Sequence, residues 1–325
     1  MKVYIVGHKG WIGQMYIELF TNLNIEYCFS EYRGESHELL CDILNQLPTN
    51  ILCCMGRTHG THDGTVYNTI DYLENDGTLV ENINDNLYVP LNLALFAKEH
   101  SIHFTYIGTG CIFSYDVSKM YPPTESVDSR RIGYPPESGE SGESGDSRRI
   151  VYPYELRTGL IKGFTEDATA NFFGSNYSIV KGFTDMLMRH TDALVLRIRM
   201  PITSTNHPRN FITKILQYKK ICSMPNSMSV LDELIPLSIK MMYANEIGCF
   251  NFTNPGYIDH NSILLLYRNY IDKDFTWENM SVEEQNYVLK AGRSNNVLCT
   301  DKLEKKYQVD TIEEAMEKVF KNWKN

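Results

Sequence analysis

The stretch VYIVGHKGWIG, Val3–Gly13, decides the fold of this 325-residue chain. An apolar run typical of a buried strand leads into Gly7, Gly10 and Gly13, and a helix-like stretch follows as far as Thr21. Gly7 permits a tight turn, Gly10 lets the backbone approach a pyrophosphate, and Gly13 lets the helix pack on the strand. The stretch therefore predicts the first unit of a doubly wound parallel sheet, an α/β fold of Rossmann type. A glycine-rich turn without a ligand is the alternative.

The glycine spacing, GxxGxxG, is the form carried by short-chain dehydrogenases and reductases, so a nicotinamide dinucleotide is the expected cofactor. Trp11 and Ile12 lie in the same turn and are predicted cofactor contacts. The next strand, residues 25–29, should end near the adenosine ribose, where a carboxylate selects NAD and an arginine selects NADP. The segment SEYRGE offers both, as Glu31 and Arg33. We expect NADPH, with NADH tolerated.

Two further cofactor contacts are predicted from later segments. Asp42, in CDIL, is expected after a short helix, where an aspartate of this superfamily commonly contacts adenine. ILCCMG, from Ile51, predicts a buried strand that ends at Gly56, with the backbone close to the cofactor.

Composition excludes several other classes of protein. The net charge of −9 argues against a nucleic-acid groove, and no apolar run is long enough to span a bilayer. We expect a soluble, cytoplasmic protein, because a strand from the second residue leaves no room for a signal peptide. The cysteines form no CxxC pair, and His59, His62 and Asp63 in RTHGTHDG lack helical spacing, so neither disulfides nor a metal site are expected.

The segment SNYSIVKGFTDMLMRH predicts a helix that carries Tyr177 and Lys181 on one face, a YxxxK motif. A tyrosine beside a lysine ammonium has a lowered phenol pKa and can donate a proton to a carbonyl oxygen that receives hydride. An exposed helical pair is the alternative. The order of glycine turn, Thr109 at a strand end and YxxxK favours a reductase.

The segment GTGCIF, residues 108–113, places a thiol near that threonine. Related dehydratases carry an acidic pair directly after the threonine, but Gly110 and Cys111 stand here, so elimination of water is not expected. A 4-keto group acidifies the hydrogens on C3 and C5 of a sugar, and a thiol can exchange them through an enolate. Alternatively, Cys111 is a small buried apolar residue.

Longer motifs carry a family resemblance. GTGCIFSYD, NFFGSNYSIVKG, LRIRMPITS, NHPRNFITKIL, PNSMSVLDELIPLSI, FNFTNPG and GRSNN occur in this order. The chain resembles nucleotide-rhamnose synthase, the bifunctional UDP-4-keto-6-deoxyglucose 3,5-epimerase/4-reductase of the extended short-chain superfamily, from the glycine turn to GRSNN.

The resemblance implies roles for named residues. Thr109, Tyr177 and Lys181 match the reductase residues, and Cys111 with Lys214 matches the epimerase pair. Lys214 lies in NFITKILQYKK, which reads as an amphipathic helix on which a lysine would by default face solvent. The matched motifs also supply the predicted substrate contacts, each of which could instead be a cap or a surface group: Asn171, Arg209, Asn210, Arg293, Asn295 and Asn296.

We expect a cofactor domain over residues 1–200 and a smaller C-terminal α/β domain, mainly for substrate, over residues 201–325. A strand at about 249–253 should return to the main sheet. A low-complexity insertion at about 116–165 contains the repeat DSRRIGYPPE and DSRRIVYPYE around SGESGESG. Its composition predicts a loop that extends from the protein surface, and a lid over the site is the alternative.

The sequence thus predicts an enzyme that epimerises UDP-4-keto-6-deoxy-D-glucose at C3 and C5 and reduces C4 with NADPH to give UDP-L-rhamnose. A UDP-glucose 4,6-dehydratase would supply the substrate, and a homodimer is possible. Two alternatives stay open: a plain nucleotide-4-ketosugar reductase, and a non-catalytic NADP-binding regulatory subunit. The nucleotide, UDP or dTDP, and inversion at C3 alone or at both carbons also stay open.

Overall fold

The computed structural model describes residues 1–115 and 163–324. Its centre is a six-stranded sheet in the order β11-β7-β6-β3-β1-β2, in which every neighbouring pair is parallel. The strands are β1 (Lys2–Val6), β2 (Glu26–Cys28), β3 (Asn50–Cys53), β6 (His103–Thr109), β7 (Leu194–Ile198) and β11 (Gly248–Asn251). The predicted doubly wound parallel sheet is confirmed. The strand order reverses between β1 and β3, and ligands of such sheets bind at the strand carboxyl ends there.

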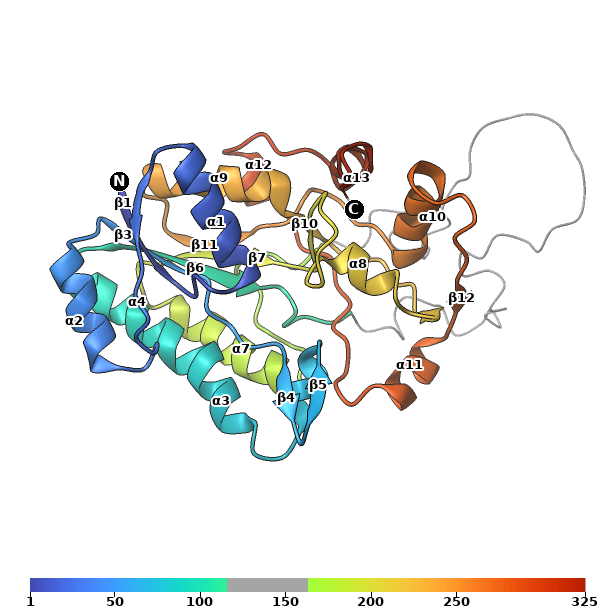
Figure 1. The fold of residues 1–325 in the computed structure, drawn as a ribbon, viewed down its shortest axis with the longest axis horizontal. Helices are drawn as coiled ribbons and strands as arrows, with labels where there is room; N and C mark the ends of the chain where they lie inside the picture. The colour runs from blue at the N-terminus through green and yellow to red at the C-terminus, as the bar shows by residue number, and fades with distance from the viewer. Residues whose placement is uncertain (116–162, 325) are drawn as a thin grey trace, which may run out of the picture.

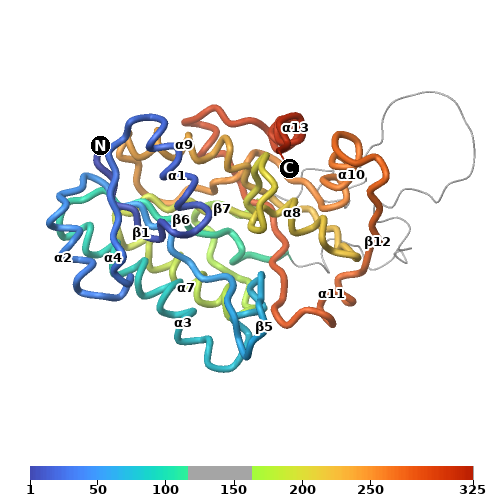
Figure 2. Tube along the Cα trace, in the orientation of Figure 1, coloured from blue at the N-terminus to red at the C-terminus, as the bar shows by residue number. Residues whose placement is uncertain are grey.

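Helices cover both faces of the sheet, as Figures 1 and 2 show. On one face lie α1 (Trp11–Asn22), α9 (Leu231–Tyr243) and the short α12 (Asp301–Glu304). On the other lie α2 (His37–Gln46), α4 (Val89–Glu99) and α7 (Asn176–Met188). The strands are apolar on both sides because each face is buried under helices.

The run from Leu79 to Glu99 is helical throughout, as α3 (Leu79–Ile83), a π-helical turn η2 (Asn84–Tyr88) and α4. Asn86 lies in the π turn and is fully buried. Its side chain accepts a hydrogen bond from the Arg57 backbone N–H (3.0 Å) and donates one to the Arg57 carbonyl (2.9 Å). The π turn therefore holds the chain that follows β3, and such turns are frequent at functional sites.

Residues after Ile198 form most of a second unit, which we call the C-terminal lobe. Its helices are α8 (Phe211–Ile215), α10 (His260–Tyr270), α11 (Val282–Val288) and α13 (Ile312–Lys321). Two short parallel pairs join them: β8 (Pro201–Ile202) with β10 (Ser229–Val230), and β9 (Lys220–Ile221) with β12 (Glu278–Asn279). The lobe has its own apolar core. However, α9 and β11 also follow residue 200 and pack in the main sheet unit, so the two units interleave along the chain.

The structure corrects three local predictions and adds one hairpin. Asp42 lies inside α2, not after a helix, because Ser36 caps a helix that continues to Gln46. The segment after β3 forms a hairpin, β4 (Gly60–His62) with β5 (Thr65–Tyr67), since Asp63 and Gly64 adopt positive φ in the turn. Helix α8 is only five residues long. Strand β3 ends at Cys53, so Gly56 follows it in an extended connection.

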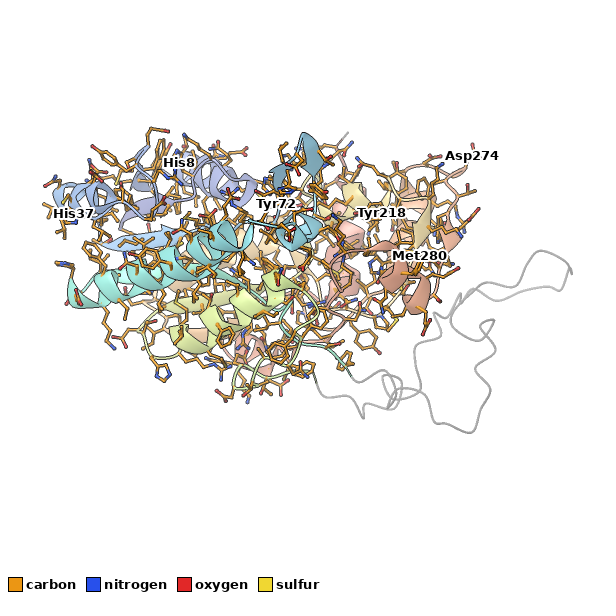
Figure 3. The ribbon with its side chains drawn as sticks, turned by 90° about the horizontal axis from the view of Figure 1, so that it is seen from below. His8, His37, Tyr72, Tyr218, Asp274 and Met280 are labelled. Carbon is orange, nitrogen blue, oxygen red and sulfur yellow. The ribbon has the colours of Figure 1, made fainter. Side chains whose placement is uncertain are left out.

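Most of the predicted insertion, residues 116–162, lies outside the described residues. In the two described stretches, no helix has both the length and the apolar character needed to cross a membrane. Figure 3 places Tyr72 and Tyr218 between His8 of the glycine turn and Met280 of the C-terminal lobe. The region around these two tyrosines, where the sheet unit meets the lobe, contains the candidate site.

Candidate active site

The fold brings Thr109, Tyr177 and Lys181 together at the end of β6. Thr109 is the last residue of that strand, and α7 begins one residue before Tyr177 because the Ser175 hydroxyl caps it. All three side chains are buried. Burial raises the pKa of Tyr177, the nearby Cys111 adds to the rise, and a hydrogen bond with Thr109 offsets part of it.

The lowered phenol pKa that the motif predicted is therefore not found, because the Lys181 ammonium points elsewhere. Its Nζ donates a hydrogen bond to the Tyr106 hydroxyl on β6 and lies 4.6 Å from the centroid of that ring. Burial lowers the pKa of Lys181 to about 8, with Cys53, Asp185 and Cys111 opposing the shift. The sequence analysis missed Tyr106, since a tyrosine inside an apolar strand looks like core.

Cys111 is half-buried next to this set and is held by its backbone. Its N–H donates to Thr109 Oγ1 (3.0 Å), and its carbonyl accepts from Ser178 Oγ on α7 (2.8 Å). A guanidinium nitrogen of Arg199 lies 3.7 Å from the thiol sulfur. The thiol therefore has a fixed position beside a cation.

Arg199 is fully buried, and among residues 1–115 and 163–324 no carboxylate pairs with it. Its N–H groups donate to the Gly110 carbonyl (3.0 Å), to Ser294 Oγ and O (3.1 and 3.0 Å) and to Asn226 Oδ1 (2.5 Å). A Cβ on Gly110 would lie 2.7 Å from Leu298 Cδ1 and 3.0 Å from the Arg199 side chain, so a larger residue there would displace these two side chains. The signal that could have revealed Arg199 was the pair of arginines in the apolar segment ALVLRIRM, because a buried arginine must be paired or functional.

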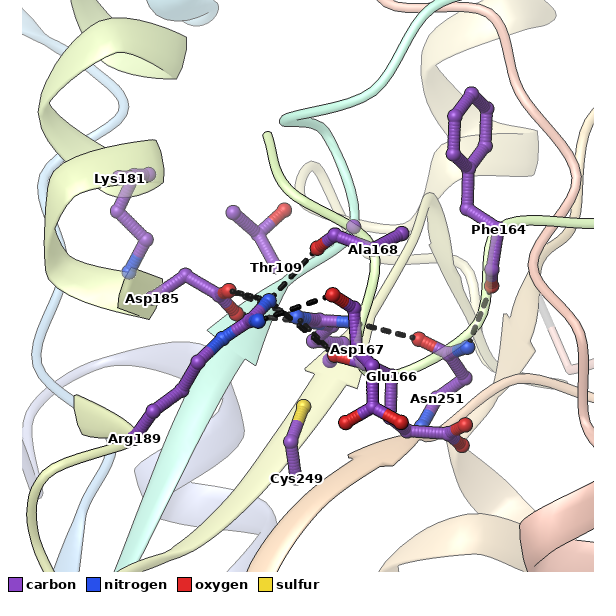
Figure 4. Close-up of polar contacts among 12 residues, drawn as sticks. Thr109, Phe164, Glu166, Asp167, Ala168, Lys181, Asp185, Arg189, Cys249 and Asn251 are labelled. Carbon is purple, nitrogen blue, oxygen red and sulfur yellow. Dashed lines mark hydrogen bonds and ion pairs between the residues drawn. The ribbon is translucent and has the colours of Figure 1, made fainter. Parts of the chain in front are cut away.

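A second buried arginine, Arg197, anchors α7 to the sheet through Asp185, which Figure 4 shows one turn from Lys181. It donates to both carboxylate oxygens of Asp185, each at 2.7 Å, and Asp185 lies one turn after Lys181. It also donates to the carbonyls of Thr165 and Glu166 and to Asn251 of β11. This cluster connects α7, β7, β11 and the segment that returns after residue 162.

Lys214, the other predicted epimerase residue, lies half-buried in α8. Burial lowers its pKa to about 8, and the charges of Arg209 and Arg293 act in the same direction. His59, which follows β3, belongs to the same region: burial lowers its pKa to about 4, and Arg209, Arg57 and Lys214 add to the effect. The structure thus gathers a positively charged region from three distant segments, suited to an anionic ligand.

The glycine turn has the predicted conformation. Gly7 has φ of 88°, and the Gly10 N–H donates to the Gly7 carbonyl (3.0 Å). A Cβ on Gly13 would lie 2.4 Å from that carbonyl oxygen, so only glycine allows α1 to start so close to β1. Trp11 stacks on His207 of the C-terminal lobe with ring centroids 5.0 Å apart, while Ile12 packs on the sheet core.

Beside the glycine turn, the predicted ribose contacts are arranged differently from expectation. Arg33 pairs with Glu35 (2.7 Å) and its side chain is 82% exposed. Glu31 instead pairs with Lys9 and with His8 (3.4 Å), both from the glycine turn. Asp42 accepts a hydrogen bond from Tyr4 (2.5 Å). Gly56 lies at the head of Lys181, where a Cβ would be 4.0 Å from Nζ.

The predicted substrate residues fall into two groups. Asn171, Asn210 and Asn296 have their side chains hydrogen-bonded to backbone: Asn171 to Ser114, Asn210 across the turn before α8, and Asn296 to the carbonyls of Gly110 and Phe113. Their contacts maintain the walls of the site.

The second group is Arg209, Asn295 and Arg293, of which only Arg293 has its charge paired with a carboxylate among the described residues. This residue donates to Asp71 (2.5 Å) and to the Ala291 carbonyl (2.8 Å). Arg209 makes one long contact with the Asn68 carbonyl (3.5 Å), and Asn295 accepts from Asn226 (3.0 Å). Arg209 is therefore the predicted contact whose charge is least engaged within the described residues.

No protein-family model matches the chain, but close relatives do. It is 44% identical over 310 residues to protein L780 of Acanthamoeba polyphaga mimivirus, covering 94% of this chain and 93% of the relative. The crystal structure of the L780 UDP-rhamnose synthase has a TM-score of 0.82 at 43% identity and covers 99% of both chains.

Plant proteins show the same relationship. The chain is 36% identical over 316 residues to a bifunctional dTDP-4-dehydrorhamnose 3,5-epimerase/dTDP-4-dehydrorhamnose reductase of Arabidopsis thaliana, covering 96% of this chain and 90% of the relative. It is 37% identical over 97% of its length to a trifunctional Arabidopsis enzyme that adds a UDP-glucose 4,6-dehydratase, but it spans only 41% of that protein. The fold alone is shared with a Bacillus anthracis dTDP-4-dehydrorhamnose reductase solved with NADP, with a TM-score of 0.69 at 14% identity over 98% of each chain.

The buried ammonium of Lys181 generates a stability prediction. Lys181→Met is expected to raise the free energy of unfolding by about 1–3 kcal/mol at neutral pH, since it replaces a desolvated charge with an apolar group of similar length. The pKa of Lys181 is about 8 in the folded protein and 10.5 in the unfolded chain, so the free energy of unfolding of wild type increases as the pH rises from about 8 to 10.5. The stability advantage of Lys181→Met over wild type therefore shrinks across this pH range. Urea unfolding at several pH values measures this.

The matched control is Lys240→Met in the exposed last turn of α9. It is expected to leave both the stability and its pH dependence unchanged. A destabilised Lys181→Met variant would show that the ammonium contributes net favourable contacts, against this account.

Proposed function

Because the chain belongs to the nucleotide-rhamnose synthase family of bifunctional 3,5-epimerase/4-reductases, we propose that it converts UDP-4-keto-6-deoxy-D-glucose to UDP-L-rhamnose with NADPH. The observation that carries the proposal is the arrangement at the end of β6. A fixed thiol at Cys111 adjoins a buried Thr109, Tyr177 and Lys181. A plain reductase needs only the latter three residues.

The epimerisation is assigned to Lys214 and Cys111. A pKa of about 8 leaves part of Lys214 neutral near neutral pH, so that it can take a proton from the carbon beside the C4 carbonyl. Thr109 and Tyr177 donate hydrogen bonds to the oxygen that then carries the enolate charge. Cys111 returns a proton to the opposite face and becomes a thiolate. Lys214 then releases its proton to water and the Cys111 thiolate takes a proton from water, so both groups can act again at the second carbon.

The reduction is assigned to Tyr177. NADPH supplies the hydride that reduces C4. The raised pKa of Tyr177 keeps the phenol protonated until that moment, which suits a proton donor to the C4 oxygen. Lys181 is positioned to bind the cofactor ribose, because its ammonium uses one N–H on Tyr106 and Gly56 adds no side chain at its head.

For the cofactor, we propose that Lys9 and His8 share the recognition of the ribose 2′-phosphate with Arg33. Support comes from the glycine turn, whose two basic side chains already hold Glu31. Glu31 can in turn accept from the 2′-hydroxyl of NADH, which accounts for tolerance of both cofactors.

A UDP-glucose 4,6-dehydratase is the proposed source of the substrate, since Arabidopsis relatives carry that activity in the same polypeptide. A cytoplasmic location is also proposed. It is supported by eight free cysteines, as expected of a chain kept in a reducing compartment.

We further propose a homodimer. Exposed apolar side chains gather on α3, α4 and α7, which lie side by side in Figure 1. They are Leu79, Val80, Ile83, Leu95, Phe183 and Leu187. Two copies related by a two-fold axis would bury this face, with the continuous run of α3 and α4 and the helix α7 contributed by each copy.

The first experiment is turnover of UDP-4-keto-6-deoxyglucose with NADPH in deuterated water, read by NMR. Wild type is expected to give UDP-L-rhamnose with deuterium at C3 and C5. In Cys111→Ala, deuterium incorporation and UDP-L-rhamnose formation should both fall by about 10²-fold or more, since the variant lacks one proton carrier. It should still reduce UDP-4-keto-L-rhamnose, because Thr109, Tyr177 and Lys181 remain.

The control is Cys299→Ala, a half-exposed thiol outside the site. Label at C3 alone would limit the inversion to that carbon. Unlabelled product, or full activity in Cys111→Ala, would identify a plain reductase. Cofactor binding without turnover of either sugar would identify a regulatory subunit.

Cofactor choice is tested by fluorescence titration of NADPH and NADH. Lys9→Ala is expected to weaken NADPH about tenfold, because a charge-assisted phosphate contact is lost, and to leave NADH nearly unchanged. Glu31→Gln should tighten NADPH and weaken NADH. The loss of NADPH affinity in Arg33→Ala measures how much Arg33 contributes to binding the 2′-phosphate. An equal loss of both cofactors in Lys9→Ala would contradict 2′-phosphate recognition.

The dimer is tested by sedimentation. Phe183→Glu, on the outer face of α7, is expected to yield a monomer, because it buries a charge at the two-fold contact. Tyr287→Glu, which is 93% exposed on α11, is the control and should not change the mass. A monomeric wild type would refute the dimer.

A further inference from the structure

Tyr106 is the one hydrogen-bond acceptor that the described residues present to the Lys181 ammonium. The contact joins two different elements, since Tyr106 lies within β6 and Lys181 in the middle of α7. Both side chains are buried, and Nζ is also 4.6 Å from the ring centroid. The phenol therefore binds the ammonium through its oxygen, at the edge of the ring.

The other titratable groups that face Lys181 cannot replace this contact. They come from β3, from the turn after β6 and from α7: Cys53, Cys111, Asp185 and Tyr177. Both oxygens of Asp185 already accept from Arg197. Thiols are weak acceptors, and the phenol of Tyr177 is hydrogen-bonded with Thr109. Tyr106 alone thus decides where the ammonium points.

The opposite side of the ammonium faces the connection after β3. A Cβ on Gly56 would touch Nζ at 4.0 Å and press on Asn86 Oδ1 at 3.3 Å, so a larger side chain there would compete for the space beside the lysine head. An ammonium has three N–H donors, of which Tyr106 takes one. The remaining two are left for the cofactor, which binds at the carboxyl ends of the strands in sheets of this topology.

We propose that Tyr106 is a positioning residue for Lys181: its hydroxyl holds the charged ammonium in the direction that presents the free N–H groups to the cofactor ribose. The proposal rests on the proposed function only in identifying that ribose. Tyr106 touches neither substrate nor cofactor and acts through the lysine.

The consequence is a change in the titration of Lys181. Burial lowers its pKa to about 8, and contacts that favour the charged form limit the fall. Tyr106→Phe keeps the ring and nearly the same volume but removes the hydroxyl, so the charged form loses a charge-assisted hydrogen bond and the neutral form only a weaker one. The pKa should fall further, by about one unit.

The experiment titrates lysines labelled with ¹³C at Cε by NMR, with Lys181→Met identifying the resonance of Lys181. Tyr106→Phe is compared with wild type and with Tyr16→Phe. Tyr16 is also fully buried, and its hydroxyl pairs with Ser238 Oγ (2.6 Å) between α1 and α9, away from the lysine. In parallel, the pH profile of kcat/KM is recorded for reduction of UDP-4-keto-L-rhamnose.

The proposal is supported if the pKa of Lys181 is about one unit lower in Tyr106→Phe than in wild type and unchanged in Tyr16→Phe. The alkaline limb of the reduction should move in the same direction, while deuterium exchange at C3 and C5 should be unchanged. An unchanged Lys181 titration in a folded Tyr106→Phe protein overturns it. If the variant does not fold, 3-fluorotyrosine at position 106 weakens the acceptor without changing the shape.

The two proposals fail separately. If wild type does not reduce the sugar, the proposed function falls, but the NMR titration still decides whether Tyr106 holds Lys181. If reduction occurs and its pH profile is the same with Phe at position 106, the function stands and the positioning role is lost.

Discussion

The bidentate ion pair between Arg197 and Asp185 is the interaction on which the site most depends. The guanidinium is fully buried in β7, and the carboxylate lies on the inner face of α7. Tyr177, Lys181 and Asp185 follow one another at intervals of four residues, so the pair fixes the rotation of the helix that presents the other two. Breaking such a pair leaves an uncompensated charge, which costs about 3–5 kcal/mol.

Arg199 follows two residues after Arg197, directly beyond the end of β7. Arg197 organises the helix side of the site, and Arg199 organises the thiol side by binding Gly110, Ser294 and Asn226. Segments that are more than a hundred residues apart thus meet at the end of one strand. A guanidinium suits this role because its five donors are rigidly oriented and it stays charged when buried.

The sequence could predict the elements whose signal is local. The glycine turn at Gly7, the strands of the sheet and the helix of Tyr177 each follow from a short pattern, and the parallel sheet follows from their order. It could not predict Tyr106, Arg197 or Arg199, because their roles are set by partners far along the chain. Asp42 and α8 were misplaced for a related reason: the capping by Ser36, and the packing that ends α8 after Ile215, decide the boundaries.

The two lysines illustrate why the rest of the site needed a structure. Both have a pKa of about 8, but the charges around them act in opposite directions. Around Lys181, Asp185 and two thiols oppose the effect of burial; around Lys214, Arg209 and Arg293 reinforce it. An anionic diphosphate bound near those arginines would cancel their influence and raise the pKa of Lys214. Lys214 is thus arranged to change its protonation as ligands come and go, whereas Tyr106 and Asp185 favour the charged form of Lys181.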